Sequence, residues 1–381
     1  MHIIVLANTI LLKNHYSGGD LVFPKMQKYF GKKISIALIG SQEAVDIWKK
    51  YSIHATYHTY VEANGIHQVV FAPILYFSRT IKAAVILFSL LKIQKSSVVI
   101  YSSSDYFPDV FPAFLATLFF NKKVVWVGRV YHVIPLAIGR GNILFTLFSF
   151  LSQRLSFRLF NRADMVFVLQ GAYKTLEKYA IQALVIPTYI GADILGLRKK
   201  SSFTAVSVGS IHRARGMDDL LPIWKAVVEK IPLAKLLIIG GGELAEVDRF
   251  KRSIIRLGLS KNIIYMGFIE DDKKMYRYIS QCTLYLCPNR EGGGMMPVAN
   301  AMRFGIPTIA YSVPVFGEMY KKGYKSVALG DREQFSSEII ALLRNKKAYI
   351  ELSKEAKKES KKYNWKEIAE EFLSALKKYH I

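Results

Sequence analysis

The segment 288–307, PNREGGGMMPVANAMRFGIP, contains the residues with the clearest capacity for chemistry. Three consecutive glycines, Gly292, Gly293 and Gly294, follow an apolar run, and glycine lets backbone N–H groups approach a ligand closely. The helix expected after them has Pro297 near its start and offers unpaired N–H groups and a partial positive charge. The pattern therefore predicts a phosphate-binding turn at the carboxyl end of a strand, where α/β sheets bind ligands.

Glu291 stands directly before these glycines. A carboxylate is an odd partner for a phosphate, but it is a good acceptor for the hydroxyl groups of a sugar. A carboxylate between a strand and a triple-glycine turn also has few structural uses. We therefore predict that Glu291 is a functional residue and that its ligand carries both hydroxyl groups and phosphate.

Short apolar runs alternate with helical segments along the whole chain and must position this turn. The expected strands are 2–7, 34–39, 98–101, 124–127, 165–169 and 184–186, then 204–208, 236–239, 263–266, 284–287 and 308–311. Strands that are apolar throughout and alternate with helices indicate parallel sheets covered on both faces. We expect an α/β protein of two doubly wound, Rossmann-like domains, 1–198 and 199–364, joined by the polar stretch 197–202. A last helix, 365–381, could pack back across both domains.

Charge, cysteine spacing and the lengths of apolar runs limit the class of protein. The chain has 381 residues, 53 Lys and Arg against 29 Asp and Glu, and a formal charge of +24, which predicts attraction to phosphates or other polyanions. Cys282 and Cys287 lie five positions apart on one expected strand, so they point to opposite faces and are expected to be buried rather than joined. We see neither a signal peptide nor an uncharged apolar run of about 18–20 residues, the length that a membrane span requires.

The whole chain resembles the retaining GT-B glycosyltransferases of family 4, the glycosyl transferases group 1. The segment 288–307 is similar to the E-G-F-G-x-P…E-A-M…G-x-P signature of that family. Further similar motifs occur in the family's order: NHYSGGD at 14–20, VIPT…GAD at 185–193, GSIHRARG at 209–216, IGGGE at 239–243 and YMGF at 265–268. The resemblance implies two domains facing a central cleft, and transfer of a sugar from a nucleotide-diphosphate sugar with retention of configuration. It implies no metal and no cofactor besides this co-substrate.

The resemblance also assigns roles to individual residues. Glu291, His132 and Arg215 are the expected catalytic residues: Glu291 would bind the donor-sugar hydroxyls, Arg215 would hold the pyrophosphate, and His132 would hydrogen-bond the sugar or the acceptor. The expected donor-binding set is Gly18, Gly19, Ser210, Arg213, Arg215, Gly267, Phe268, Glu291, Gly292, Gly293, Gly294, Met295, Met296 and Asn300.

Two positions depart from the family pattern. Ser210 stands where the family has an Arg, and Arg213 is the expected substitute. Asn300 stands where the family has a second Glu that grips the ribose, with one extra residue between it and Glu291. An Asn can hydrogen-bond ribose hydroxyls without charge assistance. The alternative function is a catalytically inactive relative that binds sugar nucleotides or glycans.

Partners follow from the resemblance and from charge. The donor is expected to be a UDP, GDP or ADP sugar, and the acceptor a glycan or a lipid-linked saccharide. The helix expected at 142–160 carries five Phe and nearby Arg, and is interpreted either as a core helix or as an interfacial helix on an anionic membrane surface. We expect a cytoplasmic, peripheral location. Nucleic acid is not expected because no such motif is present, and a nicotinamide oxidoreductase is not expected because no G-x-G-x-x-G follows the first strand.

Overall fold

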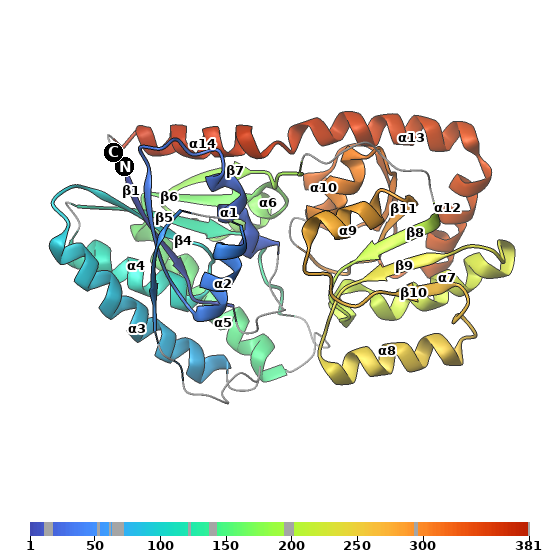
Figure 1. Ribbon diagram of the computed structural model, residues 1–381, viewed down its shortest axis with the longest axis horizontal. Coiled ribbons are helices and arrows are strands. Elements are labelled where there is room, and N and C mark those ends of the chain that lie inside the picture. Colours follow the sequence, from blue (N-terminus) through green and yellow to red (C-terminus); the bar gives the residue numbers. More distant parts are fainter. Residues whose placement is uncertain are drawn as a thin grey trace. The chain divides into compact units, whose positions relative to one another are not determined.

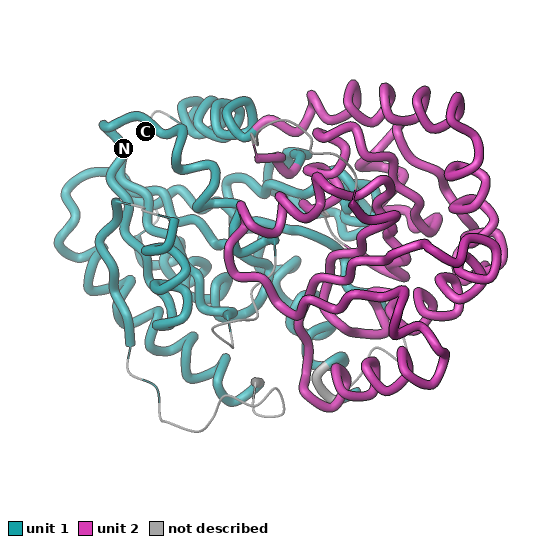
Figure 2. Tube along the Cα trace, turned by 45° about the vertical axis from the view of Figure 1, so that its right-hand side comes forward, with its two compact units in different colours: residues 1–189, 365–381 teal, residues 190–364 magenta. Residues whose placement is uncertain are grey.

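The computed structural model describes residues 1–10, 18–51, 54–60, 62, 72–120, 123–136, 143–193, 202–292 and 296–379. It divides into two compact units (Figure 2): unit 1 contains Met1–Tyr189 and Trp365–Ile381, and unit 2 contains Ile190–Asn364. Residues that follow Tyr189 belong to unit 2 because the N–H of Ala192 donates to the carbonyl of Tyr363 at 2.9 Å. Most of the linker expected at 197–202 lies outside the described residues.

Unit 1 contains a seven-stranded parallel sheet in the order β3-β2-β1-β4-β5-β6-β7 (Figure 1). Its strands are β1 (His2–Ala7), β2 (Ser35–Gly40), β3 (Thr56–Thr59), β4 (Val98–Ser102), β5 (Val124–Val130), β6 (Met165–Leu169) and β7 (Leu184–Thr188). Its helices are α1 (Val22–Gln27), α2 (Gln42–Lys50), α3 (Ala72–Ile93), α4 (Phe107–Phe119), α5 (Ile143–Leu159), α6 (Tyr173–Glu177) and α14 (Trp365–Lys377). The central strands are apolar and buried, as expected for a sheet covered on both faces.

Unit 2 contains a six-stranded parallel sheet in the order β10-β9-β8-β11-β12-β13. Its strands are β8 (Phe203–Val208), β9 (Leu236–Ile239), β10 (Ile263–Tyr265), β11 (Cys282–Cys287), β12 (Thr308–Tyr311) and β13 (Tyr324–Val327). Its helices are α7 (Met217–Lys230), α8 (Leu244–Arg256), α9 (Asp272–Ile279), α10 (Met296–Arg303), α11 (Pro314–Met319), α12 (Arg332–Arg344) and α13 (Lys346–Glu359). Both cysteines of β11 are buried and are not joined by a disulfide bond, as the sequence predicted.

Helix α14 packs on unit 1 through aromatic contacts. The ring of Phe372 stacks on Phe30 at 5.8 Å and lies 5.6 Å from Tyr101 and 5.2 Å from Phe167. Aromatic pairs at such distances add to the stabilisation from burial alone. Because these partners come from the turn after α1 and from two strands, α14 covers one face of the sheet of unit 1.

Helices α3 and α5 pack in the core of unit 1 but differ from the expected pattern. The helix at 143–159 buries Phe157 and leaves Leu147 and Leu151 exposed, so leucines rather than phenylalanines form its outer face. Sequence analysis found no apolar run of membrane-spanning length, yet residues Pro73–Ile93 of α3 are long and apolar enough to cross a membrane by length and composition alone. The sequence did not indicate this helix as an uncharged apolar run because Arg79 and Lys82 interrupt it.

Each sheet reverses its strand order at one point. In unit 1 the chain moves outward in one direction from β1 and in the other from β4, and in unit 2 the same reversal separates β8 from β11. Helices on opposite faces of a parallel sheet leave a crevice at such a point, at the carboxyl ends of the two strands. The loops that follow β1, β4, β8 and β11 are therefore the positions where this fold places ligands.

Candidate functional site

The loops after β8 and β11 meet at the reversal point of unit 2. The N–H of Arg290 donates to the carbonyl of Ala214 at 3.0 Å, which joins the two loops directly. Gly216 has φ +68°, and a Cβ built on it would lie 1.8 Å from the carbonyl oxygen of Pro288. Only glycine allows this approach without moving one of the loops. The two motifs singled out in the sequence, 209–216 and 288–292, thus form one contiguous edge.

The backbone continues this edge across β9 and β10. The N–H of Gly209 donates to Ile239 at 3.0 Å, and the N–H of Gly240 donates to Gly267 at 2.9 Å. A Cβ on Gly240 would lie 1.8 Å from the carbonyl oxygen of Gly209. Phe268, the next residue after Gly267, is 37% exposed. Gly209, Gly240 and Gly267 therefore bring the backbone of adjacent strand ends together, and Phe268 adds one accessible ring.

Glu291 and Gly292 lie directly beyond this junction. Glu291 is half-buried and Gly292 is buried, and helix α10 begins at Met296, which is 3% exposed. Gly293, Gly294 and Met295 lie outside the described residues. The described part of the predicted turn therefore places a carboxylate between the β11–β8 junction and the start of a helix.

The two candidate cations differ in their partners. Arg213 is exposed and pairs with Asp218, with 3.2 Å between Nε and Oδ2. Among the described residues, no hydrogen bond or ion pair engages the guanidinium of Arg215. It lies close enough to β11 to favour the thiolate of Cys287, although burial raises the pKa of that thiol to about 12. Of these two cations, Arg215 is therefore the one available to an anionic ligand, and Ser210 in the same loop is exposed.

A buried carboxylate that sequence reasoning missed supports this junction. Asp219 is 1% exposed, and its two oxygens accept from Arg290 and Arg332, each at 2.7 Å. Both bonds are charge-assisted, which makes them stronger than neutral hydrogen bonds. Arg290 is the residue whose N–H bonds to Ala214, so Asp219 holds the β11 loop in place one residue before Glu291.

Both the oxygen and the nitrogen of the Asn300 side-chain amide form hydrogen bonds within the protein. Its oxygen accepts from the N–H of Asp193 at 2.9 Å, and its nitrogen donates to the carbonyl of Met296 at 3.0 Å. The side chain is fully buried on α10. Asn300 therefore tethers the first residues of unit 2 to this helix, a role that the sequence did not suggest. Its contact with a ribose stays a prediction.

In unit 1, Tyr131 connects two of the predicted site residues. Its hydroxyl donates to the carbonyl of Gly19 at 2.8 Å, and the guanidinium of the buried Arg129 lies 5.0 Å from its ring centroid. Gly18 directly precedes the 3₁₀ turn Gly19–Leu21. His132 follows Tyr131, is half-buried, and accepts through its backbone carbonyl from Gln153 at 2.8 Å. The hydrogen bond of Tyr131 thus connects the segment that contains His132 to the turn that begins after Gly18.

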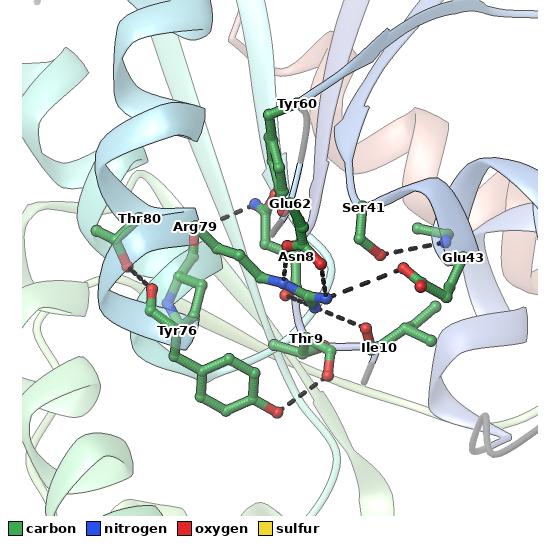
Figure 3. A network of polar contacts seen from close by, with 12 residues as sticks. Asn8, Thr9, Ile10, Ser41, Glu43, Tyr60, Glu62, Tyr76, Arg79 and Thr80 are labelled. Carbon is green, nitrogen blue, oxygen red and sulfur yellow. Dashed lines mark hydrogen bonds and ion pairs between the residues drawn. The ribbon is translucent and has the colours of Figure 1, made fainter. Parts of the chain in front are cut away.

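A buried network holds the end of β1, which precedes this region (Figure 3). The guanidinium of Arg79 donates to the carbonyls of Asn8 at 2.8 Å and Ile10 at 2.6 Å, and its other nitrogens donate to Glu62 at 2.6 and 2.9 Å. The Arg79 side chain is fully buried. Because Asn8 and Ile10 follow β1 at the reversal point of unit 1, Arg79 fixes the backbone from which the first ligand loop departs.

Asn8 is also bonded to helix α4. Its N–H and its side-chain amide both donate to Oδ1 of Asp109, at 2.7 and 3.0 Å, and its amide oxygen accepts from Tyr60 at 2.7 Å. Ser103 and Ser104, after β4, donate to the other oxygen of Asp109. Asp109 therefore joins the loops after β1 and β4. Of this network, only a lone Arg within an apolar helix could have been noticed in the sequence.

Replacing Arg79 by Met is expected to destabilise unit 1 by about 3–5 kcal/mol, because it leaves the Glu62 carboxylate, which is 11% exposed, and two carbonyls without their buried partner. Urea unfolding followed by circular dichroism measures the loss. Arg252→Met on α8 is the matched control, since Arg252 is exposed and should change stability by no more than about 0.5 kcal/mol. Equal effects of the two changes would contradict the role given to Arg79.

Two buried carboxyls of unit 1 predict a pH dependence of stability. Burial raises the pKa of Asp105 and the pKa of Asp109 from 3.8 to about 7. The folded chain therefore binds more protons than the unfolded chain between these values, so stability falls as pH rises from about 4 to above 7.

We expect the thermal midpoint to fall between pH 5 and pH 8, by roughly 2–4 °C for each kcal/mol lost. Asp105→Asn mimics the protonated acid and keeps an acceptor for Gln153, so it should flatten this fall. Asp248→Asn, at an exposed site, should leave it unchanged. A stability that rises over this interval would contradict the assignment.

No group of three or more His, Cys, Asp or Glu side chains that could hold a metal occurs within the described ranges.

Comparison with known proteins finds a family model that matches part of the chain and solved structures of similar fold. Residues 196–359 match the family described as "Glycosyl transferases group 1". An uncharacterized glycosyltransferase of Haemophilus influenzae is 25% identical over 221 residues, covering 56% of this chain and 61% of that protein. The phosphatidyl-myo-inositol mannosyltransferase of Mycobacterium leprae is 27% identical over 211 residues, covering 52% of this chain and 54% of that protein. The match thus spans less than two thirds of each relative.

One solved structure is similar to this chain over nearly its whole length. The crystal structure of Anabaena Alr3699/HepE in complex with UDP-glucose is similar with a TM-score of 0.75 at 15% identity, and the match covers 99% of each chain. At this identity the similarity concerns the fold.

Proposed function

From its GT-B fold of two parallel-sheet units and its glycosyltransferase relatives, we propose that this chain transfers a sugar from a nucleotide-diphosphate sugar to a glycan or a lipid-linked saccharide, with retention of configuration. One observation carries the proposal: Arg215 and Glu291 lie on the two loops that meet at the reversal point of unit 2. A cation for phosphate and a carboxylate for sugar hydroxyls are the two groups that such a donor requires.

The proposed chemistry uses fixed charges of the protein. As the bond between the anomeric carbon and the diphosphate breaks, negative charge grows on the leaving phosphate and positive charge grows on the sugar. Preorganised donors aimed at the growing charge are the main catalytic resource in such a site. Arg215 and the start of α10 would stabilise the phosphate. Glu291 would accept hydrogen bonds from the sugar hydroxyls and hold the anomeric carbon in position.

The remaining predicted residues complete this proposal. Gly267 and Phe268 lie at the edge where the nucleobase would bind, since backbone hydrogen bonds connect this edge through Gly240 and β9 to Gly209. Gly18, Gly19 and His132 of unit 1 would contact the donor or the acceptor. The sequence contains no D-x-D triplet, so the proposed site neutralises the diphosphate with protein groups rather than with a carboxylate-held metal.

The acceptor and the location are also proposals. The relative from Mycobacterium leprae is named for a lipid acceptor, phosphatidyl-myo-inositol. The formal charge of +24 favours binding of the protein to anionic lipid. We therefore propose that the chain acts at the cytoplasmic face of a membrane, with a lipid-linked saccharide as its acceptor.

Nucleotide binding is tested by the thermal midpoint of the protein with UDP, GDP or ADP and their sugars. A ligand present at about 100 times its Kd stabilises the folded state by about 2.7 kcal/mol. We expect one nucleotide, UDP first because the similar structure holds UDP-glucose, to raise the midpoint. Arg215→Gln should reduce that rise, while Arg252→Gln at an exposed position should not. No rise with any nucleotide would contradict the proposed donor.

A further inference from the structure

An extended apolar surface lies on two helices of unit 1. On α3 the exposed side chains are Ile74, Phe77, Ile81 and Val85, and on α5 they are Ile143, Leu147, Leu151 and Leu155. Their exposed fractions lie between 43% and 66%. We call these eight residues the α3–α5 surface. Single exposed apolar side chains are ordinary, whereas a contiguous group of this size marks a site of interaction.

The spacing of these residues places them on one stripe of each helix. Residues three, four or seven positions apart share one face of a helix, and the α3 residues follow spacings of three and four, the α5 residues a spacing of four. Helices α3 and α5 meet where the rings of Tyr76 and Phe148 are 6.1 Å apart, and both helices also pack on α4. Figure 1 shows α3, α4 and α5 on the same side of unit 1. The two stripes therefore lie on one layer of packed helices, α3, α4 and α5.

The opposite face of α3 is part of the core of unit 1. Ala83, Leu87 and Leu91 are at most 1% exposed and belong to the same cluster as Phe157 and Phe160 of the α5 region. A membrane-spanning α3 would have to leave this core, together with Arg79 and its network. The helix is therefore suited to contact an apolar phase with one stripe, without crossing it.

The charged residues around the α3–α5 surface indicate which apolar phase it contacts. From residue 72 to residue 163 the only acidic residues are Asp105 and Asp109, and both are buried. The same stretch contains 11 Lys and Arg, and of these Lys92 and Arg158 are exposed on α3 and α5 themselves. An apolar stripe bordered by cations without a single exposed carboxylate complements a bilayer with anionic head groups. A second copy of this chain would bring two such cationic faces together, which charge repulsion disfavours.

We propose that the α3–α5 surface docks the protein on an anionic lipid bilayer, with its apolar stripes inserted at the level of the head groups. The inference deepens the proposed function, because it rests on an acceptor held in a membrane and names the face that reaches it. Its test does not involve sugar transfer, so it can fail while the proposed function stands.

Sedimentation with vesicles tests the docking surface. The full chain is mixed with vesicles of phosphatidylcholine, with or without about 30% phosphatidylglycerol, in about 0.05 M and about 0.5 M NaCl. We expect binding to the anionic vesicles that weakens at the higher salt. Phe77→Ser combined with Leu151→Ser should weaken it at least about tenfold, because two apolar side chains no longer enter the lipid. Leu244→Ser with Ile255→Ser, exposed on α8 of unit 2, is the matched control and should not weaken it.

Several results would overturn the inference: no binding to anionic vesicles at low salt, equal binding to neutral vesicles, or equal loss in the two double variants. Self-association of the wild-type chain without lipid, abolished by the α3–α5 changes alone, would assign the surface to a second copy instead. The nucleotide-dependent rise in thermal midpoint is measured for each variant. If that rise persists in the α3–α5 variant while vesicle binding is lost, docking and donor binding are separate properties, as proposed.

Discussion

Glu291→Gln is expected to reduce sugar transfer by at least about 10²-fold while leaving the protein folded. The carboxylate stands between the β11–β8 junction and helix α10, where the proposed donor presents its sugar hydroxyls. Hydrogen bonds to a charged acceptor are roughly twice as strong as neutral ones, and fixed groups at the reacting centre contribute most of the stabilisation of a transition state. Gln keeps the size of the side chain and one acceptor oxygen but loses the charge.

The measurement is the release of nucleoside diphosphate from the donor identified by thermal shift, with kcat and KM determined separately. A residue that positions the sugar in the transition state should lower kcat more than it raises KM. Glu351→Gln is the control, because this carboxylate is exposed on α13. Unchanged turnover in Glu291→Gln would remove Glu291 from the mechanism. Absent turnover in the wild type, with nucleotide binding intact, would favour the inactive alternative.

The apolar strands of the fold could be predicted because burial on both faces gives an unambiguous signal. The runs at 2–7, 98–101 and 236–239 were all identified, and the structure has strands there. Of the four edge strands, β7 and β10 were identified, whereas β3 (Thr56–Thr59) and β13 (Tyr324–Val327) were missed. Their sequences, TYHT and YKSV, are partly polar, because an edge strand has neighbours on one side only and much of it faces solvent.

The location of the site could be predicted in part, from local motifs. Glycines after a strand mark a close approach of backbone, and Gly216 and Gly240 have this function. What the sequence could not provide were contacts between distant segments. Arg79 bonds to Asn8 across 71 positions, and Asp219 bonds to Arg332 across 113. The distinction between Arg213 and Arg215 likewise depends on Asp218, which pairs with the former.

Gly216→Ala is expected to disrupt the donor site by displacing the backbone of its loops. The residue has φ +68°, and the added Cβ would lie 1.8 Å from the carbonyl oxygen of Pro288, which no side-chain rotation can relieve. Either the turn that carries Arg215 or the loop that carries Glu291 must move. Displacement of reacting groups by about 1 Å can reduce a rate about 10²-fold. We therefore expect transfer to fall by about that factor, and the nucleotide-dependent rise in midpoint to be lost.

Gly258→Ala is the matched control for Gly216→Ala. It introduces the same backbone strain, an alanine at positive φ, without a clash. Gly258 has φ +71°, almost the same as Gly216, but nothing lies within 4 Å of a Cβ built on it. Both changes should cost about 1–2 kcal/mol for a left-handed alanine, and only Gly216→Ala should abolish nucleotide binding. If both variants lose stability equally and both still bind nucleotide, the junction between the two loops does not form the donor site. If Gly216→Ala alone loses binding, the close approach of Gly216 to Pro288 is what brings cation and carboxylate together.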